Sequence, residues 1–290
     1  MTDGAVAVAE KMKMPQIVIG LTIVAMGTSM PEFCVSFISA LKGTSDLAVG
    51  NIVGSNIFNA LLIVGVSALV APMTIMETTV RKDIPFALVA SALLLIMCLD
   101  GNISRLDAGI LFVMFLIFMY MTLKGAKKQG ADAEEAIEGE GKKPMSTWLS
   151  VVWILVGLLC LIGGSNLFVE GATAVATNLG VSEAVIGLTI VAGGTSLPEL
   201  ATSVVSARKG NSGIAIGNAL GSNVFNILAI LSITGMITPM TLKGITYIDL
   251  SMLVISIMLV WLFSFTKYKI ERWEGAVLTA VFVGYIYSLL

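Results

Sequence analysis

The chain has 290 residues, of which 57% are hydrophobic and only 12% carry a charge. Roughly a quarter of the residues of a soluble domain are charged, so the composition excludes an ordinary soluble protein and predicts a polytopic helical membrane protein. The net charge is −2, so nucleic acid is not expected as a partner. The chain has no histidine, which excludes metal sites and acid–base catalysis that use histidine. No P-loop motif is present, which excludes ATP hydrolysis through such a loop.

Nine apolar stretches of helix length follow one another along the chain, without the alternation that is typical of barrel strands. Between the fourth and the fifth lies a polar segment that is predicted to be a solvated linker. We therefore expect a first half over 1–123, a linker over 124–146 and a second half over 147–290. The nine stretches cover about 16–42, 46–71, 84–99, 106–123, 148–169, 182–208, 212–238, 246–266 and 273–289.

The basic residues predict how these spans cross the membrane. If the 124–146 linker is cytoplasmic and the spans alternate in direction, fourteen of the 17 Lys and Arg residues lie on the cytoplasmic side. This distribution follows the positive-inside rule. It predicts a multi-pass protein of the cell (inner or plasma) membrane.

The segment 20–59 is repeated at 187–226, with 25 identical residues in the 40 aligned positions and no gap. Five spans separate the start of one copy from the start of the other, so the two copies cross the membrane in opposite directions. Inverted repeats are typical of secondary transporters, whose site lies at mid-membrane between the copies. The span 148–169 precedes the second copy, and its counterpart would lie before Met1. The fold prediction is therefore an all-α protein of two inverted repeats, with the first helix missing.

The motif GTSMPE at 27–32 returns as GTSLPE at 194–199. Pro31 interrupts helical hydrogen bonding, and Ser29 and Glu32 have the spacing of a capping box, so a new helix is predicted to begin within the membrane. Thr28 and Glu32 lie on one face of that helix. The motif could simply cap a broken helix, but two buried glutamates in matching positions favour a function. The oxygen donors suit Na⁺ or Ca²⁺, and the candidate ligands are Thr28, Ser29, Glu32, Thr195, Ser196 and Glu199.

The motif GNIVGSNIFN at 50–59 returns as GNALGSNVFN at 217–226. Its GxxxG spacing lets helix backbones approach closely, both within a copy and between the copies. One helix face adds further candidate ligands, which are Ser55 and Asn59 in the first copy and Ser222 and Asn226 in the second. The other asparagines of the motif are predicted to form hydrogen bonds between helices, with direct ligation as the alternative. These are Asn51, Asn56, Asn218 and Asn223.

At these two motifs the sequence resembles the cation/calcium exchanger superfamily, and within it the prokaryotic sodium/calcium exchangers. The resemblance covers essentially the whole chain and implies ten helices in two inverted sets of five, of which nine are seen here. It also implies ion ligands at the ten side chains named above and at the main-chain carbonyls of Ala25 and Ala192. Some relatives carry Asp at the position of Asn226, so only two acidic ligands are expected in this chain.

The predicted function is an electrogenic antiporter in which Na⁺ entry expels Ca²⁺ by alternating access. A proton/calcium exchanger is the alternative, and an intramembrane enzyme using Glu32 and Glu199 or a passive cation channel are more remote ones. No enzymatic activity and no cofactor are expected. The expected partners are Ca²⁺ and Na⁺ as transported ions and the lipid bilayer, and the protein is expected to be a monomer.

Overall fold

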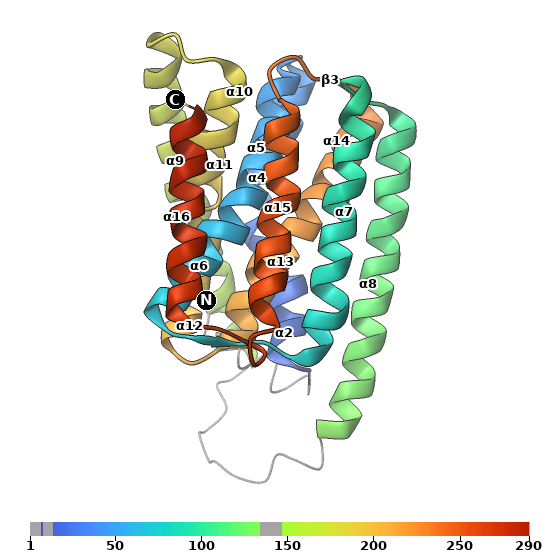
Figure 1. The fold of residues 1–290 in the computed structure, drawn as a ribbon, viewed down its shortest axis with the longest axis vertical. Coiled ribbons are helices and arrows are strands. Elements are labelled where there is room, and N and C mark those ends of the chain that lie inside the picture. The colour runs from blue at the N-terminus through green and yellow to red at the C-terminus, as the bar shows by residue number, and fades with distance from the viewer. Residues whose placement is uncertain (1–6, 8–13, 134–146, 290) are drawn as a thin grey trace.

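The computed structural model describes residues 7, 14–133 and 147–289. Most helices run along the long axis of one bundle (Figure 1). The first half contains α2 (Gln16–Ile19), η1 (Gly20–Val24), α3 (Ala25–Thr28), α4 (Met30–Leu41), α5 (Ser45–Ile57), η2 (Phe58–Ile63), α6 (Val64–Val70), η3 (Thr79–Asp83), α7 (Ile84–Met97), η4 (Cys98–Asp100) and α8 (Arg105–Ala133). The second half contains α9 (Thr147–Asn178), α10 (Glu183–Ile186), η5 (Gly187–Val191), α11 (Ala192–Thr195), α12 (Leu197–Arg208), α13 (Ser212–Phe225), η6 (Asn226–Leu231), α14 (Ser232–Ile237), α15 (Tyr247–Ser264) and α16 (Arg272–Leu289).

Helices occupy all nine predicted apolar stretches. Among the described residues, six helices are long and apolar enough to cross a membrane, and two bent pairs raise the number to eight if each pair is one span. The ninth helix, α16, falls outside this set, because Arg272 and Glu274 lie in its first turn. The all-α fold of a multi-pass membrane protein is therefore confirmed, whereas a membrane crossing by α16 stays a prediction.

Two helices are longer than the hydropathy pattern predicted. α8 continues ten residues past position 123, so the first part of the predicted linker is helical, and 134–146 lie outside the described residues. α9 continues past position 169 to Asn178. Gly180, with φ +78°, follows that end in the left-handed conformation that commonly terminates helices. Hydropathy locates the apolar part of a helix, and both helices extend beyond it because nothing in their sequence breaks them earlier.

The centre of the bundle is formed by the two continuous spans α5–η2–α6 and α13–η6–α14, most of whose residues are buried. Helix α9, by contrast, lies at the periphery with very few buried residues. It contacts α11 and α12 of its own half and α3 and α4 of the other half. The central spans therefore form the buried core of the bundle, and α9 covers it from outside.

Two short antiparallel strand pairs connect the halves. β1 (Met73–Thr74) pairs with β4 (Lys269–Ile270), and β2 (Asn102–Ile103) pairs with β3 (Met240–Thr241). β3 lies at the upper end of the bundle in Figure 1, and the segments that carry β1 and β4 lie at the lower end. Each pair joins a segment of the first half to a segment of the second, so the halves are connected at both ends.

Candidate cation-binding site

A break in each bent helix pair places one glutamate at the centre of the bundle. α3 ends at Thr28 and α4 begins at Met30, with a bend of 46° between the two parts of the span. The corresponding bend between α11 and α12 is 45°. Pro31 lies in the first turn of α4, where a backbone N–H would have no acceptor within the helix, so its absence breaks no helical hydrogen bond. Glu32 and Glu199 follow in matching first turns, and both are fully buried. The predicted helix start within the span is thus confirmed.

Each of these carboxylates is bound by a serine of the other copy. The Ser29 hydroxyl donates a 3.0 Å hydrogen bond to Oε1 of Glu199, and the Ser196 hydroxyl donates a 3.0 Å bond to Oε1 of Glu32. Neither serine caps its own helix. The capping box predicted for Ser29 and Glu32 is therefore wrong, because the N–H of Ser29 already donates to the carbonyl of Ala25 at 2.9 Å and is not available to the Glu32 side chain. The reciprocal bonds bring the two acidic side chains to one place.

The threonines of the motif are bound by asparagines of the opposite copy. The Thr28 hydroxyl donates to Oδ1 of Asn218 at 3.0 Å, and the Thr195 hydroxyl donates to Oδ1 of Asn51 at 3.0 Å. Asn51 in turn donates to the main-chain oxygen of Glu32 at 3.2 Å. Asn218 likewise donates to the main-chain oxygen of Glu199 at 3.2 Å. The predicted hydrogen bonding between helices is thus confirmed for both asparagines, and each also binds the backbone of a glutamate.

Asn56 and Asn223 also connect the central helices. The side-chain amide of each donates to the main-chain oxygen of the other, at 3.3 and 3.2 Å. The prediction of helix–helix hydrogen bonding is therefore confirmed for this pair as well. In addition, Asn226 donates from Nδ2 to Oδ1 of Asn56 at 3.0 Å, which fixes the orientation of the Asn226 amide.

The remaining predicted side-chain ligands are fully buried, but the two copies use them differently. Ser222 donates to Oε1 of Glu199 at 3.2 Å, whereas Ser55 donates to the carbonyl of Ala192 at 3.3 Å. The side chain of Asn59, the counterpart of Asn226, makes no hydrogen bond to any group that the structure describes. Corresponding residues of the two copies are thus identical in type here but form different hydrogen bonds.

The carbonyls of Ala25 and Ala192 lie at the break of each span. Ala25 O accepts the backbone N–H of Ser29 at 2.9 Å, and Ala192 O accepts the N–H of Ser196 at 3.1 Å. Each carbonyl oxygen also lies 3.3 Å from the threonine hydroxyl of its own motif. Both carbonyls are thus engaged by the protein, and their role as ion ligands stays a prediction.

The GxxxG glycines bring the two copies into backbone contact. A Cβ atom on Gly54 would lie 2.5 Å from the carbonyl oxygen of Leu188, and one on Gly221 would lie 2.7 Å from that of Leu21. α5 therefore packs on η5 of the second copy, and α13 packs on η1 of the first. Close packing between the copies is confirmed at these glycines, and only glycine fits there.

Four π-helical turns surround the site, and the sequence analysis did not predict them. η1 and η5 precede the broken motifs, and η2 and η6 include Asn59 and Asn226. A π turn is uncommon and often marks a functional site. The only sequence signal is that η1 and η5 have the same residues, GLTIV, in both copies.

Several buried oxygens at this centre have no hydrogen-bond partner among the described residues. They are Oε2 of Glu32, Oε2 of Glu199, and Oδ1 of Asn59, Asn223 and Asn226. Buried acceptors are rarely left unsatisfied in proteins, since each costs about 1–3 kcal/mol and a charged one costs more. Two carboxylate and three amide oxygens are a hard donor set, which fits Na⁺ or Ca²⁺. The described residues contain no cluster of three or more His, Cys, Asp or Glu that could hold a metal ion instead.

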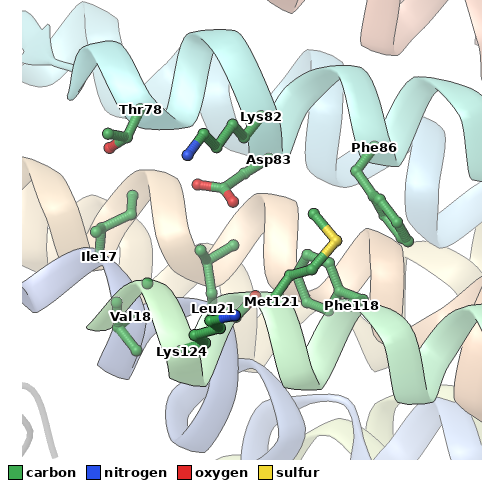
Figure 2. A pocket seen from close by; sticks show the side chains of 12 residues that line it. Ile17, Val18, Leu21, Thr78, Lys82, Asp83, Phe86, Phe118, Met121 and Lys124 are labelled. Carbon is green, nitrogen blue, oxygen red and sulfur yellow. The ribbon is translucent and has the colours of Figure 1, made fainter. Parts of the chain in front are cut away.

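A cavity of about 350 Å³ lies elsewhere, between α2 and η1 on one side and η3, α7 and α8 on the others (Figure 2). Lys82, Asp83 and Lys124 line it together with apolar side chains such as Phe86 and Phe118. Not one of the predicted ligands lines this cavity. It is therefore separate from the candidate cation site.

Comparison with known proteins agrees with this geometry. A model of the family described as "Sodium/calcium exchanger protein" matches residues 1–124 and 149–290. The chain belongs to the sodium/calcium exchanger family. It is 37% identical over 282 residues to the inner membrane protein YrbG of Escherichia coli, covering 95% of this chain and 86% of YrbG. It is 30% identical over 327 residues to the sodium/calcium exchanger MaX1 of Methanosarcina acetivorans, covering 98% of this chain and 92% of MaX1.

Solved structures of the sodium–calcium exchanger NCX_Mj have the same fold. One of them, soaked with Na⁺ and Ca²⁺, superposes with a TM-score of 0.83 at 30% identity, covering 100% of this chain and 92% of that one. The membership covers both halves of the chain and identifies a family of ion exchangers. The chain is thus a multi-pass membrane protein of a cation/calcium exchanger family.

Proposed function

We propose that this family member is a secondary antiporter that exchanges Na⁺ for Ca²⁺, with Ca²⁺ extrusion coupled to Na⁺ entry. The observation that carries the proposal is the pair of fully buried carboxylates, Glu32 and Glu199. Each has one oxygen bound by a serine of the other copy and one oxygen without a partner among the described residues. Their combined charge of −2 equals the charge that one Ca²⁺ neutralises. Burial of such a pair without a cation is costly, since like charges repel in a medium of low dielectric.

The ligands in this proposal are the side chains predicted from the two motifs. Glu32 and Glu199 supply the charge, and Asn59 and Asn226 supply neutral oxygens that have no other partner. The hydroxyls of Thr28, Ser29, Thr195, Ser196, Ser55 and Ser222, and the carbonyls of Ala25 and Ala192, complete the shell. All ten of these side chains are fully buried, which supports this assignment.

Alternating access requires that the buried site open to either side of the membrane. Glu32 and Glu199 are fully buried, so ions reach them only if surrounding helices move. The peripheral helix α9 is suited to such a motion. Beside it, an open apolar groove of about 530 Å³ lies between α9 residues such as Leu161 and α12 residues such as Leu200, so α9 is not tightly packed along this side. In this proposal the halves span 1–123 and 147–290, and the 124–146 segment is cytoplasmic.

Ion flux into reconstituted vesicles tests the proposal. Proteoliposomes loaded with Na⁺ and diluted into Na⁺-free medium should accumulate radioactive Ca²⁺, whereas K⁺-loaded or protein-free vesicles should not. A pH gradient without Na⁺ should give no uptake. Uptake that follows the pH gradient and ignores Na⁺ would identify a proton/calcium exchanger, and uptake without any counter-ion would identify a passive channel.

A further inference from the structure

We propose that the cavity shown in Figure 2 binds the headgroup of a phosphatidylethanolamine molecule from the bilayer, with the lipid phosphate on Lys82 and Lys124 and the lipid ammonium group on Asp83. None of the predicted cation ligands lines this cavity. The inference therefore goes beyond the proposed exchange of Na⁺ for Ca²⁺ and does not depend on it.

The cavity lies at the level of the membrane surface. The span Thr79–Asp100 begins beside it, and the span Arg105–Gly125 ends beside it. Nζ of Lys124 lies 5.5 Å from the centre of the Tyr120 ring, and tyrosine is enriched where lipid headgroups meet water. Met121 lines the cavity and is 45% exposed, so the cavity reaches the outer surface of α8. The headgroup of a surrounding lipid can therefore enter it from the bilayer.

Three charged side chains line the cavity. Figure 2 shows Lys82 and Asp83 extending from η3 on one side of it and Lys124 lying opposite, on α8. Lysine donates charge-assisted hydrogen bonds to phosphate, and basic pockets between spans at the cytoplasmic side are suited to lipid headgroups. Two ammonium groups and one carboxylate thus match the phosphate and the single ammonium group of phosphatidylethanolamine.

Asp83 distinguishes among lipids that share the phosphate. The ammonium group of ethanolamine offers three N–H donors to a carboxylate. The quaternary amine of phosphatidylcholine has no N–H to donate. Phosphatidylglycerol carries no cation, so its phosphate would lie beside an uncompensated carboxylate, which is unfavourable away from water. The carboxylate therefore favours ethanolamine over both of the other headgroups.

The rest of the cavity wall is apolar and suits the part of the lipid next to the headgroup. Ile17, Leu21, Phe86 and Phe118 line it, and its volume of about 350 Å³ lies within the range of pockets that hold small ligands. α2 and η1, which carry Ile17 and Leu21, begin the bent span that leads to Glu32. The lipid therefore contacts the span that carries one of the two buried carboxylates.

The second copy binds a carboxylate near the corresponding junction with its own side chain. Tyr285 on α16 stands at the position of Phe118 and donates a 2.9 Å hydrogen bond to Oδ1 of Asp249, near the start of α15. Phe118 has no hydroxyl group to offer Asp83. The carboxylate of the first copy therefore faces a cavity, whereas that of the second copy is bound by a tyrosine.

Native mass spectrometry of the delipidated protein in detergent tests the proposal. The probes are phosphatidylethanolamine, phosphatidylcholine and phosphatidylglycerol with the same acyl chains. We expect one phosphatidylethanolamine molecule to bind at least roughly tenfold more tightly than either other lipid, the factor that one hydrogen bond to a charged group supplies. Equal binding of the three lipids, or a preference for either of the others, overturns the proposal.

Charge variants assign the lipid to this cavity. Asp83→Asn should abolish the preference for phosphatidylethanolamine over phosphatidylglycerol, a comparison within one variant that a change in stability does not imitate. Lys82→Gln combined with Lys124→Gln should weaken binding of both lipids at least roughly tenfold. The control is Lys42→Gln, which removes a charge from the exposed turn after α4 and should leave binding unchanged. An unchanged preference in Asp83→Asn, or equal binding by the double variant and the control, overturns the proposal.

Discussion

Ser29 and Glu199 lie 170 residues apart in the chain, and the hydroxyl of the first donates a 3.0 Å hydrogen bond to Oε1 of the second. The equivalent bond from Ser196 to Glu32 runs in the opposite direction between the copies. Each copy thus orients the carboxylate of the other. One oxygen of each carboxylate is fixed in this way, and the second oxygen has no hydrogen-bond partner among the described residues.

Removal of either serine hydroxyl is expected to weaken Ca²⁺ binding. A hydrogen bond to a charged group contributes about 1.5–3 kcal/mol, so Ser29→Ala and Ser196→Ala should each lower Ca²⁺ affinity roughly tenfold or more. Isothermal titration in detergent measures the change. Ser256→Ala is the matched control, since its buried hydroxyl bonds only to Leu253 O within α15. Unchanged affinity in both site variants would show that these bonds do not organise the site.

Neutralising one carboxylate is expected to abolish exchange. Glu32→Gln and Glu199→Gln keep the side-chain volume but leave a charge of −1 opposite Ca²⁺. Loss of one partner of a buried charged interaction costs about 2–5 kcal/mol, so Na⁺-driven Ca²⁺ uptake should fall at least roughly 30-fold. The control is Asp107→Asn, whose carboxylate bonds to Ser104 at an exposed helix start. A single Gln variant with normal uptake would remove that residue from the site.

Ca²⁺ is expected to stabilise the folded protein. A ligand that binds only the native state at 100 times its dissociation constant adds about 2.7 kcal/mol. Thermal unfolding in detergent should therefore shift to higher temperature with Ca²⁺ and return when the ion is chelated. Mg²⁺ should stabilise less, because it sheds its water reluctantly. A shift of equal size in Glu32→Gln would indicate that Ca²⁺ acts at another place.

Side chains at the GxxxG positions are expected to destabilise the contact between the copies. Gly54→Ala and Gly221→Ala insert a methyl group where backbone atoms of the other copy lie within 2.5–2.7 Å. Overpacking of this kind costs about 1–3 kcal/mol. Gly109→Ala in α8 is the control, since a Cβ there meets nothing within 4 Å. Unfolding midpoints measure the difference, and equal midpoints for Gly54→Ala and Gly109→Ala would contradict the close contact.

The sequence predicted the positions of the helices well because apolar length and proline breaks are local properties. The predicted stretch 16–42 corresponds to Gln16–Leu41, and 212–238 corresponds to Ser212–Ile237. The repeat also predicted that both glutamates would lie at matching buried positions. The predicted C-terminal ends of α8 and α9 were wrong, because polar residues can continue a helix beyond its apolar part.

Bonding partners could not be predicted from spacing. The capping-box pattern of Ser29 and Glu32 is local, whereas the observed acceptor comes from the other half of the chain. The difference between the hydrogen bonds of Ser55 and Ser222 likewise could not be predicted from two closely similar motifs. A hydroxyl can donate only to an acceptor at hydrogen-bond distance. Which acceptors lie at that distance depends on how the two copies pack against each other.

The strand pairs β1–β4 and β2–β3 make the two halves of the chain dependent on each other during assembly. Each pair takes one strand from before 124–146 and one from after it, so a chain cleaved in that stretch would still have backbone hydrogen bonds between its fragments at opposite ends of the bundle. Alone, neither fragment can form the hydrogen bonds of its strands, and neither can bury the surface around Gly54 or Gly221 that packs against the other copy. Separately expressed fragments should therefore be unstable alone and complement each other when produced together.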